Sequence, residues 1–246
     1  MALTSLWYYL SKNLTFSQLK NRSFLRKECR QLRGHIMDLG CGNGEYSFLM
    51  ARIRTNHITA LDSSPERRGG IQKLIRENAH SNITVVDGDA HQLPWKANTF
   101  DAVFCNTVLE HVPHPEQVIK EIHRVLKKQG TVLLSIPFLQ EIHADPYDFQ
   151  RYTPHGMKIR LEEAGFQIKK IQMDAGSLNA LEYLLLGSIV WRIRLGFWKN
   201  MPFGYAYICF LALFFLAAKL GHLLFYPLQK NDRHFMTQVT AIATKK

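Results

Sequence analysis

Cysteine is scarce in this chain and is never paired at short spacing. The four cysteines are Cys29, Cys41, Cys105 and Cys209, and no C-x-x-C pair occurs. This spacing argues against a thiolate zinc site and against a disulfide framework. We therefore predict no metal site and a reducing, cytosolic setting for the chain.

Other signals are missing as well. The first 33 residues lack a basic segment followed by an apolar stretch, so they do not resemble a signal peptide. No internal repeat and no low-complexity tract occurs anywhere in the 246 residues.

The composition supports a folded core and shows a basic charge balance. Hydrophobic residues make up 46% of the chain, which is ample for one α/β domain with additional material. The formal net charge is +11. This excess fits an anionic partner such as nucleic acid, acidic lipid or an acidic small molecule, and it equally fits a solvated basic surface.

From residue 34 onward, short apolar runs alternate with amphipathic segments. We predict helices at 45–53, from 63 onward, at 115–128 and at 153–165. The alternation predicts a mostly parallel sheet with helices on both faces. Its seven expected strands cover 35–39, 57–62, 82–89, 100–107, 131–137, 166–174 and 234–246. We accordingly divide the chain into a basic helical segment (1–33), a core (34–176), an apolar helical insert (177–230) and a last core strand (231–246).

The stretch "HIMDLGCGNGEYS" at 35–47 contains three alternating glycines. The dinucleotide fingerprint G-x-G-x-x-G fails here because Glu45 occupies the third glycine position, and no phosphate loop G-x-x-x-x-G-K-[ST] occurs. An acid at the start of a helix would also repel a pyrophosphate. The ligand of this loop is therefore not expected to be held by phosphate.

The pattern Asp38-x-Gly40-x-Gly42-x-Gly44 resembles motif I of class I S-adenosylmethionine (SAM)-dependent methyltransferases, in the branch that includes quinone-biosynthesis enzymes. The resemblance covers about 34–175 and the last strand. It implies a seven-stranded Rossmann-like fold with SAM as cofactor. The cofactor-binding residues that it implies are Asp38, Gly40, Gly42, Gly44, Asp62, Asp89, Ala90 and Asn106.

The resemblance assigns a role to each acid and to the amide. Asp62 would accept from the ribose hydroxyls, Asp89 from the adenine amine beside the Ala90 N–H, and Asn106 would lie near the methionine part. Simpler roles remain open: Asp38 orienting the loop, Asp62 capping a helix, and Asp89 and Asn106 serving in turns. All these residues follow parallel strands, whose carboxyl ends bind ligands in open α/β sheets.

Two histidines are candidates for a catalytic base. His111 follows Asn106 by five residues, and the loop "EIHADPYDFQRYTPHG" at 141–156 contains His143 and Asp145. The loop resembles one found in a subset of these enzymes that act on glycans or lipid-linked compounds. A hydroxyl acceptor must lose its proton, and histidine suits that task. We predict His143 as the base with Asp145 orienting it. The alternatives are a structural His111 and a self-bonded loop.

The insert at 177–230 is rich in Leu, Phe, Tyr and Trp, and 201–218 contains no charge. Because the strands before and after it belong to one sheet, we expect it to start and end on the same side of a membrane. We therefore predict helices that lie in an anionic membrane interface, on the cytoplasmic side. The alternative is a helical cap or a dimer contact.

The predicted function is SAM-dependent methyl transfer to a hydrophobic or lipid-linked small molecule at a membrane surface. Two alternatives remain. A tRNA or protein methyltransferase fits the charge, although no N-P-P-[YF] signature or added RNA-binding module occurs. A non-catalytic membrane adaptor with a SAM-binding fold is the other. The sequence predicts no oligomeric state.

Overall fold

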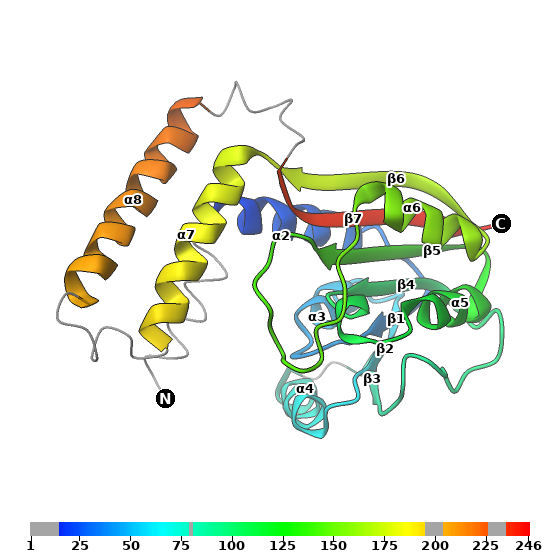
Figure 1. Ribbon diagram of the computed structural model, residues 1–246. Coiled ribbons are helices and arrows are strands. Elements are labelled where there is room, and N and C mark those ends of the chain that lie inside the picture. Colours follow the sequence, from blue (N-terminus) through cyan, green and yellow to red (C-terminus); the bar gives the residue numbers. More distant parts are fainter. Residues whose placement is uncertain (1–14, 79–80, 195–203, 226–234) are drawn as a thin grey trace. The chain divides into compact units, whose positions relative to one another are not determined.

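The computed structural model describes residues 15–78, 81–194, 204–225 and 235–246 (Figure 1). The chain divides into two compact units. The core unit comprises Phe24–Phe138, Ile142–Gln172 and Val239–Lys246, and the helical unit comprises the described parts of 1–23, 139–141 and 173–238. Each unit is described by itself below.

A seven-stranded sheet organises the fold, as predicted. Its strands are β1 (His35–Leu39), β2 (His57–Leu61), β3 (Ile83–Val86), β4 (Phe100–Asn106), β5 (Leu126–Pro137), β6 (Phe166–Ala175) and β7 (Met236–Lys245). Their order across the sheet is β3-β2-β1-β4-β5-β7-β6. The pairs from β3 to β5 are parallel. β6 and β7 run in opposite directions in Figure 1, so the sheet is mostly parallel.

The order of the strands locates the place where a ligand can bind. β1 lies between β2 and β4, and the chain proceeds outward from it in both directions. At such a switch point the loops after neighbouring parallel strands diverge and leave room at the carboxyl edge. The glycine loop follows β1, and Asn106 ends β4, so both lie at this edge.

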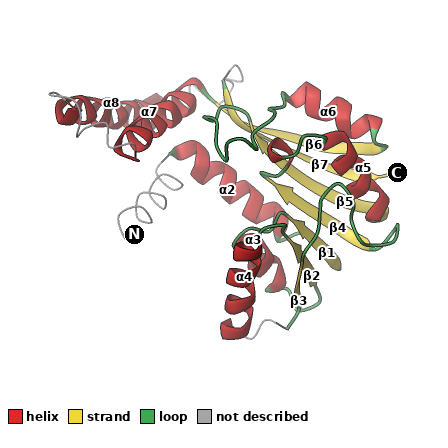
Figure 2. Ribbon diagram, turned by 60° about the horizontal axis from the view of Figure 1, so that its bottom comes forward, coloured by secondary structure: helices red, strands yellow, loops and turns green. Residues whose placement is uncertain are grey.

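Helices cover the two faces of the core sheet. Figure 2 shows α3 (Glu45–Ala51) and α4 (Pro65–Asn78) on one side and α5 (Pro115–Val125) and α6 (Pro154–Glu163) on the other. The last turns of α2 (Phe16–Cys29) bring Leu25 and Cys29 into the hydrophobic cluster between the sheet and α3. Side-chain caps start α4 and α6, since Ser64 and Thr153 accept the backbone N–H groups three residues later.

The boundary between α5 and β5 differs from the predicted one. The amphipathic pattern predicted a helix to residue 128, but α5 ends at Val125 and β5 begins at Leu126. Leu126 has extended backbone and pairs with Phe100 in the sheet, and both side chains are fully buried. The register then shifts before Ala102 pairs with Thr131. Sheet pairing of a buried leucine therefore outweighs the local helical pattern.

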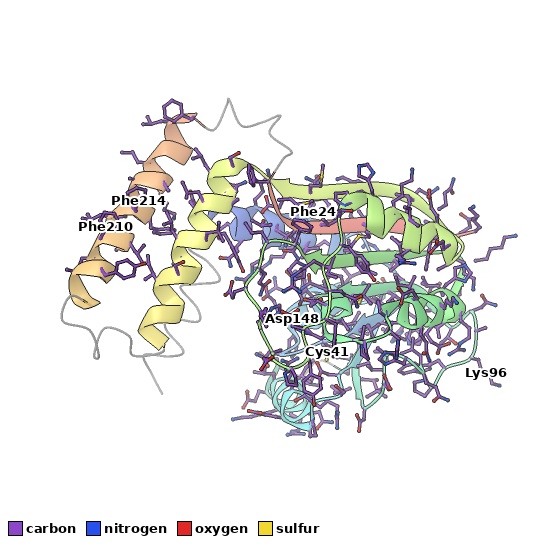
Figure 3. All side chains as sticks on the ribbon, viewed as in Figure 1. Phe24, Cys41, Lys96, Asp148, Phe210 and Phe214 are labelled. Carbon is purple, nitrogen blue, oxygen red and sulfur yellow. The ribbon has the colours of Figure 1, made fainter. Side chains whose placement is uncertain are left out.

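The helical unit contains the two long apolar helices α7 (Ser177–Arg194) and α8 (Gly204–Phe225), which lie between β6 and β7 in the sequence. They pack on each other through a small cluster of Leu186, Ile189, Leu211 and Phe215. Other large apolar side chains of α8 are exposed, including Phe210 and Phe214 (Figure 3). Among the described helices, none combines the length and the apolar character that a membrane crossing requires.

Candidate cofactor and acceptor site

The loop after β1 needs glycine at three positions for different reasons. Gly40, Gly42 and Gly44 have φ angles of 72°, 55° and 78°, a region that other residues rarely adopt. A Cβ on Gly40 would lie 2.3 Å from Val108 Cγ2, and one on Gly44 would lie 2.5 Å from Ile71 Cδ1. A Cβ on Gly42 would meet no atom within 4 Å. The backbone at Gly42 therefore faces open space in which a ligand can lie against it.

Asp62 holds this loop in place from the end of β2. Its Oδ2 accepts from Gly42 N at 2.9 Å, and its Oδ1 accepts from Ser64 N at 2.9 Å. The side chain is only 5% exposed, and Arg67 Nη1 lies 3.8 Å from Oδ2. Each carboxylate oxygen keeps a second lone pair. Asp62 therefore joins the glycine loop to the start of α4 and can still accept from a ribose diol.

Asp38 is buried beneath the glycine loop, so its side chain is not exposed for contact with a ligand. Its carboxyl group is 2% exposed and accepts a hydrogen bond from Ser47 Oγ in α3. Burial raises the pKa of Asp38 to about 7, against an ordinary value of 3.8. This placement supports the loop-orienting role that the sequence left open for Asp38.

The raised pKa of Asp38 predicts a pH-dependent stability. Between about pH 4 and pH 7 the folded state retains a proton that the unfolded chain has released, so stability falls as pH rises through this window. Asp38→Asn removes this dependence. We expect its stability relative to the parent to increase by roughly 2–4 kcal/mol from pH 4 to pH 8. Urea unfolding across this range measures the difference, and parallel pH profiles would contradict the prediction.

Asp89 and Ala90 follow β3, at the same edge of the sheet. The Asp89 side chain is 68% exposed, and its Oδ1 accepts from His91 N and pairs with His91 Nδ1, each at 2.8 Å. The His91 backbone N–H is the main cause of the lowered pKa of Asp89. An exposed, ionised acceptor at this place fits the predicted contact with an adenine amine.

Asn106 ends β4, next to an unusual backbone turn. Thr107 has a φ of 53°, and its N–H donates to Ser135 O at 2.9 Å. Asn106 Nδ2 donates weakly to Thr107 Oγ1 at 3.5 Å. The open space at Gly42 and the acceptor oxygens of Asp62 and Asp89 thus fit a nucleoside with an amino acid part.

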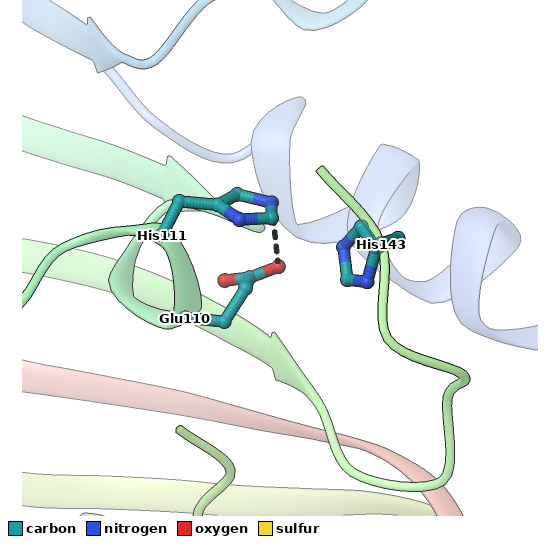
Figure 4. Close-up of side chains that lie close together, drawn as sticks. All are labelled: Glu110, His111 and His143. Atoms are coloured by element: carbon teal, nitrogen blue, oxygen red, sulfur yellow. Dashed lines mark ion pairs between the residues drawn. The ribbon is translucent and has the colours of Figure 1, made fainter. Parts of the chain in front are cut away.

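Two histidines from separate segments meet beyond the end of β4 (Figure 4). His111 belongs to the short 3-10 helix η1 (Leu109–His111), and its ring contacts that of His143 edge-on, with centroids 4.7 Å apart. His111 Nδ1 lies 2.6 Å from Tyr147 O. Burial lowers the pKa of His111. The two candidate bases therefore lie together, and the lowered pKa favours the neutral form of His111.

The acid that orients His143 is not the predicted one. The Asp148 carboxylate pairs with His143: its Oδ2 lies 3.3 Å from Nδ1 and accepts from the His143 backbone N at 3.0 Å. The chain turns at Ala144, whose φ is 57°, and this reversal returns Asp148 to His143. Asp145 is exposed on the turn. The predicted pairing of Asp145 with His143 is therefore corrected to Asp148.

Arg151 completes this arrangement. Its guanidinium donates to both oxygens of Asp148 and holds the pKa of that carboxyl well below its usual range. The sequence reasoning missed Asp148 as a partner of His143. The sequence signal that could have identified Asp148 was its spacing from Arg151, three residues later. This spacing favours an ion pair, which keeps the acid ionised.

The sequence reasoning also missed Glu110 as a residue of this site. Its side chain is completely buried, and burial raises its pKa to about 7. Neither of its carboxylate oxygens has a hydrogen-bond partner in the part of the chain that the structure describes. The sequence signal that could have identified Glu110 was its position directly before His111, in the otherwise apolar stretch "VLEHV".

Comparison with known proteins agrees with this geometry. Residues 37–134 match the family described as "Methyltransferase domain". The ubiquinone/menaquinone biosynthesis C-methyltransferase UbiE of Agrobacterium fabrum is 29% identical over 141 residues, which cover 54% of each chain. The demethylmenaquinone methyltransferase of Listeria monocytogenes is 34% identical over 99 residues, covering 39% of this chain and 41% of that one. This chain thus spans about half the length, or less, of these curated relatives.

The solved structures agree at the level of the fold. The structure of the [4+2]-cyclase SpnF covers 90% of this chain and 79% of its own, with a TM-score of 0.63 and 23% sequence identity. A likeness at this identity concerns the fold alone. Residues 37–134 thus match a methyltransferase domain, and the sheet order and the glycine loop give the core of this chain the fold of class I SAM-dependent methyltransferases.

Proposed function

We propose that this chain transfers the methyl group of SAM to a hydrophobic, quinone-like or lipid-linked acceptor at a membrane surface. The observation that carries the activity is the glycine loop, open at Gly42 and tied to Asp62, at the carboxyl edge of the sheet. The names of the matching relatives support a quinone-like acceptor.

SAM supplies a methyl group on a sulfonium, and the transfer needs alignment more than covalent help from the protein. In this chain the loop from Gly40 to Gly44 and the Asp62 carboxylate hold the cofactor. Asn106 and the histidine pair line the edge where an acceptor can approach. His111 Nδ1 donates to the Tyr147 carbonyl, which accepts only, so Nε2 carries the lone pair that can remove a proton.

The exposed face of α8 supports action at a membrane. Leu211 and Phe215 face α7, whereas the opposite side presents large apolar side chains to solvent. The exposed members are Phe210, Leu213, Phe214, Leu216, Leu220, Leu224 and Phe225. Such a surface binds the boundary between headgroups and acyl chains, and the chain's net charge of +11 favours anionic lipid. We place the protein on the cytoplasmic face, as a peripheral or monotopic protein.

A methyl-transfer assay tests the proposal. The purified full chain is incubated with methyl-labelled SAM and a total membrane-lipid extract, either dispersed in detergent or incorporated into phosphatidylglycerol vesicles. We expect label in the organic phase and faster labelling with vesicles. Replacing Phe214 and Leu220 by Ser removes two large exposed apolar groups, so vesicle binding should weaken at least about tenfold, whereas SAM affinity should not change.

The matched control is Leu74→Ser, because Leu74 is an exposed leucine of α4 in the core unit. It should leave vesicle binding unchanged. If SAM binds but no extract accepts label, the proposed activity is wrong. If labelling proceeds equally without vesicles and the Phe214/Leu220 variant binds vesicles like the parent, the membrane part is wrong.

A further inference from the structure

We propose that Glu110, His111 and His143 bind one divalent transition-metal ion beside the cofactor site. The first observation is that the carboxylate of Glu110 is buried without a hydrogen bond. Its side chain has no exposed surface, and neither oxygen has a hydrogen-bond partner among the described residues, although Oε1 lies 3.7 Å from His111 Nε2. Burying a carboxylate without a hydrogen bond or a cation is costly, so such a group calls for a proton or a positive ion.

The three side chains converge on one point (Figure 4). One ligand atom from each lies within 4.8 Å of the others, and Glu110 Oε1 is 3.7 Å from His111 Nε2. Metal–ligand bonds of about 2.0–2.2 Å need donor atoms roughly 3–4 Å apart. The site therefore needs to contract by only about 1 Å around an ion.

Each histidine is held in the form that binds a metal. The Tyr147 carbonyl can only accept, so His111 carries its proton on Nδ1 and turns its Nε2 lone pair towards Glu110. The ionised Asp148 likewise favours a proton on His143 Nδ1, which leaves the lone pair on Nε2. Histidines that ligate metals usually donate their other N–H to a carbonyl or a carboxylate in this way.

Hydrogen bonds also join the two segments that carry the ligands. Phe149 N donates to Glu110 O at 2.7 Å. The Gln150 side-chain amide donates to Leu109 O at 2.6 Å and to Val112 O at 2.9 Å, on either side of Glu110 and His111. The loop after β5 is thus fastened to η1 after β4, so the ligands are preorganised before an ion arrives.

Two imidazoles and one carboxylate are ligands for Zn²⁺, Mn²⁺, Fe²⁺ or Co²⁺, and three protein ligands leave coordination positions open. No thiolate is needed, so the cysteine spacing does not oppose this site. We infer that an open position takes a hydroxyl oxygen of the acceptor and lowers its pKa, so that its proton can leave to water. With the ion bound, the His111 Nε2 lone pair is a ligand, and the ion replaces the histidine as the group that activates the acceptor. This role, unlike the binding of the ion itself, rests on the proposed function.

Metal titration of the chelator-treated full chain tests the site. Calorimetry with Zn²⁺ and Mn²⁺ should show one ion per chain, and Co²⁺ should give a visible absorption band from bound ion. Glu110→Gln and His143→Ala should each weaken binding at least 100-fold and abolish the metal-dependent rise in melting temperature. Glu110→Gln also removes a buried acid, so its melting temperature without metal should stay equal or increase.

Exposed residues provide the controls: Glu77→Gln on α4 matches the loss of the acid, and His155→Ala on α6 matches the loss of the imidazole. Both should bind metal like the parent. The proposal is overturned if the parent binds no stoichiometric ion, or if Glu110→Gln binds as tightly as the parent. If the ion binds but SAM-dependent labelling never occurs, the metal site stands and its role in methyl transfer falls.

Discussion

Asp62→Ala is expected to abolish measurable SAM binding, with a loss of affinity of at least 100-fold. The carboxylate accepts the N–H groups of Gly42 and Ser64, both at 2.9 Å, and it is almost fully buried. Its removal leaves two backbone donors without partners and frees the loop that forms the cofactor cradle. We expect the free energy of unfolding to fall by about 2–3 kcal/mol as well. Calorimetric titration with SAM and urea unfolding measure the two effects.

Glu66→Ala is the matched control for this variant. Glu66 lies four residues further along in the exposed first turn of α4, so the change in net charge is the same, but no contact with the glycine loop is lost. We expect a cost below about 1 kcal/mol, from the helix dipole, and unchanged SAM affinity. If Asp62→Ala bound SAM as tightly as Glu66→Ala, the assignment of the cofactor cradle would be wrong.

The arrangement of Asp62 illustrates what the sequence was able to predict. Short buried runs, each followed by Gly, Asp or Asn, place these residues at the ends of parallel strands, and all such ends meet at one edge. The positions of the residues expected to bind the cofactor therefore followed from the strand pattern, whereas their roles come from the resemblance and stay predictions. The seven strands were found for the same reason, since each is a short apolar run that ends at a turn residue or at the start of a helix.

The acceptor side was harder to predict because its contacts depend on a turn. Asp145 and Asp148 both follow His143 closely, and spacing alone does not tell which one returns to the ring. The positive φ of Ala144 decides it, and Tyr147 N closes the turn on Ala144 O at 2.8 Å. Alanine gives no warning of that conformation. Glu110 was overlooked for a related reason, because its burial depends on a loop about 40 residues away.

Gly40→Ala is the second substitution for which we expect a large effect. The new methyl group would overlap Val108 Cγ2, and a φ of 72° is unfavourable for alanine. We expect a destabilisation of about 2–4 kcal/mol and loss of SAM binding, measured by urea unfolding and calorimetry. Gly69→Ala in α4 is the control. A Cβ there meets no atom within 4 Å, so it should stabilise the chain by about 0.5–1 kcal/mol.

A double variant separates the two causes. Gly40→Ala with Val108→Ala removes the overlap but leaves the backbone strain, so we expect it to recover part of the stability lost by Gly40→Ala alone. Val108 directly precedes η1, so the same contact links the cofactor loop to the segment that carries Glu110 and His111. The alternative outcome is that the stability loss of the double variant equals the sum of the losses of Gly40→Ala and Val108→Ala. That result would show that Val108 does not contact the cofactor loop strongly and that the loop and the segment with Glu110 and His111 are independent.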